Sequence, residues 1–421
     1  MNFIKKLFWG KIKEYYSNDT LKSEGKIMLF RKFGVWNEFY ENGQLKKTGA
    51  YKKNLKVSVW YSYYQNGKLK IKENFIVKEN ESVLNSEKIT YFEDGQIEFK
   101  GFYNNGLKVG LHEHYYRNGN VKSLTNYESD KLHGNLKEFF EDGTLRCELF
   151  YDKGLKNGSF KSYYKNSNPW CYSNYLNNKE HGECKYYSKI GTIDKIEHYN
   201  EGLKHGEFRL YYENGQILMI KNYVNNIVHG HFENYYPNGQ LKSKGAIKNG
   251  KDNGYWEEFH ENGNLEFKGN YLDGMLIDNE EIYYHYDGSV YSKCQLVNGK
   301  LEGKKTTYDI NGNIVSEQLY KNNLRHGPGI SIYNGFVGSE TNYFEDKEHG
   351  TQKYHHFNSK IIDCIGSYKY GTEHGTTQYF YKNGQLKSET NYHNGSPYGL
   401  SKEYFEDGKL KKQYDWGSLD N

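Results

Sequence analysis

The feature that most constrains this chain is a unit of about 24 residues that recurs from one end to the other. Most copies carry an aromatic pair, an Asn-Gly or Asp-Gly step, and then an aliphatic residue; the turn residue is Asp19, Ser167 or Ser359 in three copies. In the stretch 205–230, Tyr211-Tyr212 precede Asn214-Gly215, and Ile217 follows. A fixed period of 20–50 residues is typical of stacked repeat architectures. We count about 17 copies, so the sequence predicts one array rather than two or three globular domains.

The Asn-Gly step between two alternating runs predicts a β-hairpin in which both turn residues take positive φ. In such a two-residue turn, Tyr212 would face Ile217 and Tyr211 would face Leu218. We therefore expect an all-β fold, an elongated array of about 17 antiparallel β-hairpins with a 24-residue period.

Two columns of side chains follow from this pairing, because neighbouring residues of a strand point to opposite faces. Aromatic residues such as Tyr236 would face aliphatic ones such as Leu241 on the buried face. The tyrosine eight residues after each turn glycine, such as Tyr51, would lie on the same face. On the exposed face an aromatic residue would face a cation. We take members of this exposed pair as candidate partner-binding residues: Tyr63, Lys70, Tyr115, Lys122, Phe139, Arg146, Tyr235, Lys242, Tyr404 and Lys411.

The chain divides into a short basic segment and the array. Residues 1–13 place apolar side chains at helical spacing with lysines between them, which predicts a short helical cap over the first hairpin. A membrane-surface helix and a frayed tail are the alternatives. Residues 14–421 form a single array. Residues 77–90 contain a four-residue insertion, read as a polar loop and a candidate hinge, and Pro169 predicts an altered turn.

No catalytic or cofactor-binding motif occurs in the sequence. There is no phosphate-binding G-x-x-x-x-G-K-[ST], no zinc-protease H-E-x-x-H and no G-x-S-x-G. His-Gly recurs seven times, but histidines one repeat apart would lie about 10 Å from each other, too far to share a metal ion. We expect surface histidines, with each glycine at a tight backbone position. The expectation is a protein that is no enzyme and has no cofactor or metal.

The net charge and the cysteines indicate which cellular compartment and which class of partner to expect. The net charge is only +4, which gives no reason to expect nucleic-acid binding. The five cysteines contain no C-x-x-C, which favours a reducing, cytoplasmic location. Cys147 and Cys171 hold equivalent positions in neighbouring repeats, so we expect both to be reduced.

The spacing G-x-x-x-x-Y-Y-x-N-G-x-L-K, followed by Y-x-x-G-x-x-H-G, resembles the MORN repeat. It is most similar to the bacterial variant that is often labelled the antitoxin component of a toxin–antitoxin system. The resemblance spans roughly residues 10–416. It implies stacked antiparallel hairpins, binding rather than catalysis, and an antitoxin or immunity role. The kinase names that some MORN proteins carry do not apply, because no kinase motif is present.

The sequence therefore favours a protein-binding scaffold whose partner is a protein, with a toxin as the partner that the resemblance implies. One alternative is a scaffold on an anionic membrane surface, held by residues 1–13. Another is a set of cell-wall glycan- or choline-binding repeats, which use tryptophan cages. Only 6 tryptophans occur, in no regular column, which counts against this alternative.

Overall fold

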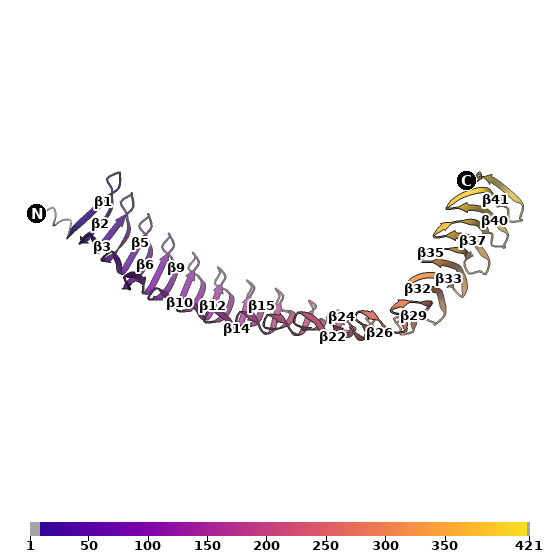
Figure 1. Ribbon diagram of the computed structural model, residues 1–421, viewed down its shortest axis with the longest axis horizontal. Helices are drawn as coiled ribbons and strands as arrows, with labels where there is room; N and C mark the ends of the chain where they lie inside the picture. The colour runs from indigo at the N-terminus through magenta and orange to yellow at the C-terminus, as the bar shows by residue number, and fades with distance from the viewer. Residues whose placement is uncertain (1–8, 419–421) are drawn as a thin grey trace. The chain divides into compact units, whose positions relative to one another are not determined.

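The computed structural model describes residues 9–418, and these residues form an all-β repeat array, as the sequence predicts. The chain divides into two compact units, Met1–Gly215 and Gln216–Asn421. Figure 1 shows the consecutive strands of each unit side by side in chain order.

The first unit contains β1 (Trp9–Tyr15), β2 (Leu21–Met28), β3 (Arg31–Phe39), β4 (Leu45–Lys52), β5 (Leu55–Tyr63), β6 (Leu69–Lys78), β7 (Glu81–Leu84), β8 (Ser86–Tyr91), β9 (Ile97–Asn104), β10 (Leu107–Tyr115), β11 (Val121–Glu128), β12 (Lys131–Phe139), β13 (Leu145–Asp152), β14 (Leu155–Tyr163), β15 (Pro169–Leu176), β16 (Lys179–Glu180), β17 (Gly182–Tyr187), β18 (Ile193–Asn200), β19 (Leu203–Lys204) and β20 (Gly206–Tyr211).

The second unit contains β21 (Ile217–Val224), β22 (Ile227–Tyr235), β23 (Leu241–Lys248), β24 (Lys251–Asp252), β25 (Gly254–Phe259), β26 (Leu265–Leu272), β27 (Met275–Leu276), β28 (Glu280–Tyr284), β29 (Val290–Val297), β30 (Lys300–Leu301), β31 (Gly303–Tyr308), β32 (Ile314–Lys321), β33 (Leu324–Tyr333), β34 (Phe336–Phe344), β35 (Lys347–Glu348), β36 (Gly350–His355), β37 (Ile362–Lys369), β38 (Thr372–Glu373), β39 (Gly375–Phe380), β40 (Leu386–His393), β41 (Ser396–Tyr404) and β42 (Leu410–Asp415).

Most of the turns that follow the aromatic pairs are three-residue loops, not the two-residue turns that we predicted. At the turn between β22 and β23, the Tyr236 amide donates to the Gln240 carbonyl at 2.8 Å, and the Gly239 amide donates to the Tyr236 carbonyl at 2.9 Å. Only Gly239 takes positive φ (86°), whereas the Asn238 side chain accepts a bond from the Gln240 amide at 2.9 Å. Tyr235 consequently faces Leu241 rather than the predicted Lys242. This loop is a type I turn closed by a left-handed residue.

Among the turns that follow the aromatic pairs, the Asn334-Gly335 step forms the predicted two-residue turn, as the Asn-Gly steps at 105–106, 249–250, 298–299 and 394–395 do at the other strand ends. Between β33 and β34, Tyr333 pairs with Phe336. Asn334 and Gly335 both take positive φ, at 50° and 78°.

A second kind of hairpin turn, which the sequence analysis missed, joins the other ends of the strands. Between β21 and β22, Asn225 and Asn226 take φ of 50° and 70°, and Val224 pairs with Ile227. Both central residues are left-handed, which is the geometry of a type I′ turn. Each repeat therefore contributes two turns, and the strands form a continuous antiparallel meander within each unit.

The glycine of each His-Gly step lies at a tight backbone position, as predicted. Gly206 takes φ of 102°, and the amide of the preceding His205 donates to the His198 carbonyl at 2.8 Å. The ladder is interrupted here, between β19 and β20. Glycine suits this site because it has no Cβ to oppose positive φ.

Three local predictions need correction. Residues 9–13 belong to β1, where Ile12 pairs with Gly25, so the helical cap is wrong for these residues, and residues 1–8 lie outside the described part. The insertion in 77–90 lengthens the hairpin of β6 and β7, with Phe75 opposite Leu84, rather than forming a loop. The hinge stays a prediction. Pro169 opens β15 opposite Tyr163, and the turn before it keeps the usual hydrogen bonds.

The core is a column of side chains seven residues before each turn glycine, which the sequence analysis did not identify. Trp36, Trp60 and Trp256 in this column are 3%, 3% and 8% exposed. The indole N–H of Trp256 donates to the Ala246 carbonyl at 3.1 Å. The buried side chains of His112 and Gln352 reach the equivalent carbonyls, those of Phe102 and Asn342, at 2.9 and 2.8 Å. A buried carbonyl at this position therefore keeps a partner although the residue type changes.

A glycine lies under each of these tryptophans. A Cβ on Gly245 would overlap the Trp256 ring, and Gly25 and Gly49 lie in the same way under Trp36 and Trp60. Above Gly245, Phe232 and Trp256 approach to 5.4 Å between ring centroids. The tyrosines eight residues after the turn glycine are half-buried against this column, as Tyr51 is against Trp60 at 4.8 Å.

We predict that Gly245→Ala destabilises the second unit by about 1–3 kcal/mol, because the new methyl group forces the indole of Trp256 out of its site. Urea denaturation followed by tryptophan fluorescence measures the change. Gly338→Ala is the control, since its Cβ would meet no atom closer than 3.4 Å. Equal stability of the two variants would contradict the close packing of glycine and tryptophan.

Candidate functional site

The predicted partner-binding residues occupy two neighbouring columns beside the turns. The cations Lys70, Lys122, Arg146, Lys242 and Lys411 are exposed. The aromatic residues Tyr63, Tyr115, Phe139, Tyr235 and Tyr404 are half-buried.

The cations do not lie over the aromatic residues with which we paired them. Lys242 Nζ lies 5.5 Å from the ring centroid of Tyr236, one residue later than the predicted Tyr235. Lys70 lies over Tyr64 at 5.1 Å, and Lys122 lies over Tyr116 at 5.7 Å. The three-residue loop explains the difference, because it moves the register of the two strands by one residue.

The remaining two cations differ in their contacts. Lys411 lies 5.9 Å from the ring centroid of Phe405, following the same displaced register. Arg146 instead approaches Glu138 at 3.8 Å, with 61% of its side chain exposed. An exposed ion pair of this kind contributes at most about 1 kcal/mol.

The tyrosine under each cation links its repeat to the next one. The Tyr236 hydroxyl donates to the Phe259 carbonyl at 2.9 Å. Equivalent bonds of 2.7–3.0 Å run from Tyr16 to Phe39, Tyr40 to Tyr63, Tyr64 to Tyr91, Tyr116 to Phe139, Tyr164 to Tyr187, and Tyr381 to Tyr404.

Histidine replaces tyrosine in three copies and keeps the contact. The Nε2 atoms of His260, His285 and His356 lie 3.0, 2.9 and 3.1 Å from the corresponding carbonyl oxygens. Tyrosine and histidine share a ring with a polar hydrogen-bonding atom at its far side. We expected this column to be buried by aliphatic pairing, but its members are half-buried and hydrogen-bond across the repeats.

Two tyrosines of the aromatic column that we expected to meet the cations bond to acidic side chains, whereas the ring centroid of Tyr115 lies 6.0 Å from Lys100 Nζ. The Tyr404 hydroxyl donates to Glu389 at 3.1 Å, and Tyr235 donates to Glu233. Burial, together with the Glu233 carboxylate, raises the pKa of Tyr235 to about 12. Lysine and glutamate pair on neighbouring strands of this face, as Lys244 and Glu257 do at 2.8 Å. The face thus carries charges of both signs.

The histidines of the His-Gly steps are exposed or half-exposed. In residues 9–418, no group of three or more histidine, cysteine, aspartate or glutamate side chains could hold a metal ion. Three of these histidines contact another ring, each with 4.8 Å between the ring centroids. The pairs are His326 with Phe344, His349 with Tyr370, and His374 with His393. Within the described range, no helix is long and apolar enough to cross a membrane.

All five cysteines are free thiols, which agrees with the prediction for Cys147 and Cys171. The sequence analysis missed the contact between Cys171 and Cys184, whose sulfurs lie 3.7 Å apart. Their 13-residue separation places them on the neighbouring strands β15 and β17, whereas Cys147 and Cys171 are one full repeat apart. Both thiols are buried.

The repeat geometry is matched by a family model described as "MORN repeat variant". The matching residues are 34–53, 56–76, 84–105, 108–129, 132–153, 204–225, 228–249, 252–273, 301–322, 373–394 and 397–416. The chain belongs to this family of MORN repeat variants. MORN repeats are repeat modules that generally serve in binding or scaffolding.

Solved structures that match the chain come from much longer proteins. TcdB2-TccC3 without its hypervariable C-terminal region is 11% identical with a TM-score of 0.16, covering 96% of this chain and 26% of that one. A Tc holotoxin pore of Photorhabdus luminescens is 10% identical with a TM-score of 0.15, covering 96% and 26%. This MORN chain therefore spans about a quarter of their length. TM-scores this low support neither a shared overall fold nor a shared function. No curated protein sequence matches the chain.

We predict that Tyr236→Phe weakens the junction to the next MORN repeat by about 0.5–1.5 kcal/mol, because the Phe259 carbonyl loses its donor. Hydrogen exchange measured by mass spectrometry should show faster exchange in β25. Tyr235→Phe is the matched control, since its hydroxyl bonds within its own repeat. Unchanged exchange in Tyr236→Phe would show that these bonds do not hold neighbouring repeats together.

Proposed function

We propose that this MORN chain is a non-enzymatic scaffold that binds a partner protein in the cytoplasm. The observation that carries the proposal is the column of exposed cations above the linking tyrosines, repeated along both units. Five free cysteines support a reducing compartment. The antitoxin or immunity role is the form of this function that the sequence resemblance implied, and it rests on that resemblance alone.

The cation column is pre-organised for binding. Lys242 lies over a tyrosine ring that is itself fixed by a hydrogen bond to the next repeat. A side chain that is already ordered loses less entropy when a partner binds it. Eight copies carry a cation at this position, so a partner carrying carboxylates can be bound at several places at once. These cations are Lys22, Lys46, Lys70, Lys122, Arg146, Lys242, Lys387 and Lys411.

We predict that reversing three cations, in a Lys70→Glu, Lys122→Glu and Lys242→Glu variant, reduces recovery of the partner at least tenfold in a cross-linked pull-down from the native lysate. The reason is that carboxylates of the partner would then meet like charges. The control reverses Lys52, Lys248 and Lys321, which are exposed at the opposite strand ends. Equal recovery with both triple variants would exclude the cation column as the binding surface.

A membrane-surface role is a second candidate, favoured by exposed apolar side chains at the N-terminal edge. Trp9 is 70% exposed, and Leu29 and Val35 are each 63% exposed. Trp9 and Phe33 line a groove of about 280 Å³ together with Lys11. Aromatic side chains next to lysines suit an anionic lipid surface. The glycan alternative has less support, because three of the six tryptophans, Trp36, Trp60 and Trp256, are buried in the core.

For the membrane role we predict flotation of the full-length protein with anionic vesicles and loss of flotation in Trp9→Ser. Trp170→Ser is the control, since Trp170 is also exposed, at 47%, away from this edge. Absence of flotation with the unmodified protein would eliminate this candidate and leave the protein-binding scaffold.

A further inference from the structure

The repeat junction around residues 275–299 lacks a backbone hydrogen bond that neighbouring junctions have. At these junctions the second residue of the short turn donates its amide to a carbonyl of the preceding repeat. Gly250 donates to Val228 at 2.9 Å, and Gly274 donates to Asp252 at 2.8 Å. The described residues include no such bond between Gly299 and Leu276, which occupy the same positions one repeat later.

A one-residue insertion accounts for the interruption. The turn glycines Gly263 and Gly288 are 25 residues apart instead of 24. Residues 277–279 lie between β27 and β28, outside either strand. β26 and β28 share a single paired position, Phe267 with Tyr283. The insertion therefore makes the ladder irregular at this junction, where the Leu296 amide donates to the Asn279 carbonyl at 2.8 Å.

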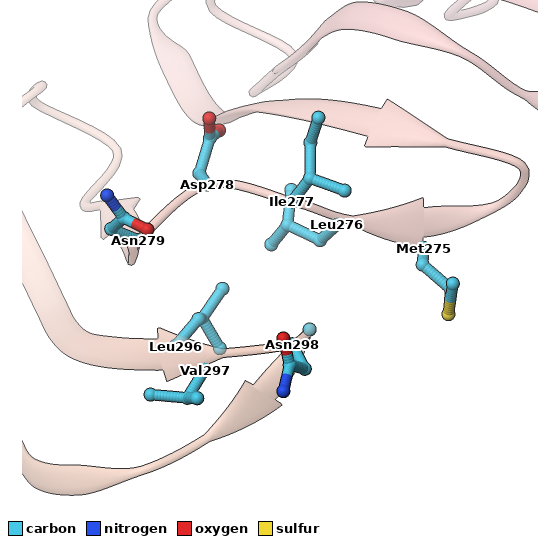
Figure 2. A pocket seen from close by; sticks show the side chains of 9 residues that line it. Met275, Leu276, Ile277, Asp278, Asn279, Leu296, Val297 and Asn298 are labelled. Atoms are coloured by element: carbon cyan, nitrogen blue, oxygen red, sulfur yellow. The ribbon is translucent and has the colours of Figure 1, made fainter.

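A pocket of about 400 Å³ lies at this junction, lined by aliphatic side chains and by the polar side chains of Asp278, Asn279 and Asn298. Its volume is within the range of ligand sites. Figure 2 shows Leu276 and Ile277 on one side of it and Leu296 and Val297 on the other. Leu296 is 7% exposed, whereas Ile277 and Val297 are 53% and 55% exposed. Exposed apolar side chains around a buried one form a place where another apolar group can be inserted.

The sequence around the pocket is acidic. Between Lys268 and Lys293 there is no lysine or arginine, whereas this stretch contains Asp273, Asp278, Glu280, Glu281 and Asp287. Among the described ion pairs, none involves these five carboxylates. The carboxylate of Asp278 accepts bonds from the backbone amide and the side chain of Asn270, at 2.7 and 2.8 Å. Cations occur in the surrounding strands, at Lys251 of β24, Lys268 of β26, Lys293 of β29 and Lys300 of β30.

We propose that this pocket binds an extended, basic segment of a partner protein. One aliphatic or aromatic side chain of the segment enters between Leu276 and Leu296, and flanking lysine or arginine residues face the exposed carboxylates of Asp273 and Glu280.

This inference rests on the proposed protein-binding function but assigns it a second site with the opposite charge. The cation column suits a carboxylate-bearing surface, whereas the pocket suits a cationic one. Different variants therefore test the two sites, and an experiment can exclude one site without excluding the other.

The test uses the full-length chain and labelled peptides of eight residues in a fluorescence anisotropy titration. One peptide has a central leucine pair flanked by lysines, a second has glutamates in place of the lysines, and a third has serines in place of the leucines. We expect binding of the first peptide only, with affinity falling as salt is raised. Equal binding of all three peptides, or of none, would overturn the proposal.

Two variants locate the binding. Ile277→Ser and Glu280→Lys should each weaken the first peptide at least tenfold, whereas Ile310→Ser, at a side chain 59% exposed elsewhere in the unit, should leave it unchanged. The triple reversal of Lys70, Lys122 and Lys242 should also leave it unchanged. A change in oligomeric state with Ile277→Ser would make the pocket a contact between copies of the chain and overturn the proposal.

Discussion

The hydrogen bond from the aromatic residue before each turn to a carbonyl of the next repeat is the contact on which the array depends. It fixes one repeat against its neighbour at the same place in successive copies, as between Tyr236 and Phe259. Tyrosine and histidine both make this contact, so the requirement is for a ring with a polar atom at the right distance. The same ring supports the exposed lysine, and the interaction that joins repeats thereby also arranges the surface we assign to binding.

The sheet obtains its core from its own side chains. Tryptophans lie over glycines of the preceding strand, and their N–H groups bond to carbonyls at the interrupted ladder positions. Tyrosines such as Tyr51 pack against them. In a repeat array stability is approximately a sum of repeat and junction terms. A junction with a missing bond, such as that between Leu276 and Gly299, is therefore a place where a partner can bind without disturbing distant repeats.

The repeat period and the turn residues were enough to predict the fold class. They were not enough to predict which residues face each other across the two strands of a hairpin. Asn-Gly is compatible with two-residue and three-residue loops, and the choice between them shifts Lys242 from Tyr235 to Tyr236. The buried column seven residues before each turn glycine was not predicted, because tryptophan, histidine, cysteine and glutamine all occur in it. No single residue type identifies this position in the sequence. The ten candidate residues lie beside the turns, but their pairings depended on a register that the sequence does not specify. The pocket arises from one inserted residue, whose effect on strand pairing appears only in three dimensions.

The central claim is that the cations above the linking tyrosines form the protein-binding surface of this MORN chain. The most direct measurement is lysine-specific cross-linking in the native lysate, with mass spectrometry to identify which lysines are joined to which protein. The account predicts that one protein is captured and that its cross-links concentrate at Lys70, Lys122 and Lys242. Cross-links spread evenly over all exposed lysines, or concentrated at the opposite strand ends around Lys52 and Lys248, would contradict it.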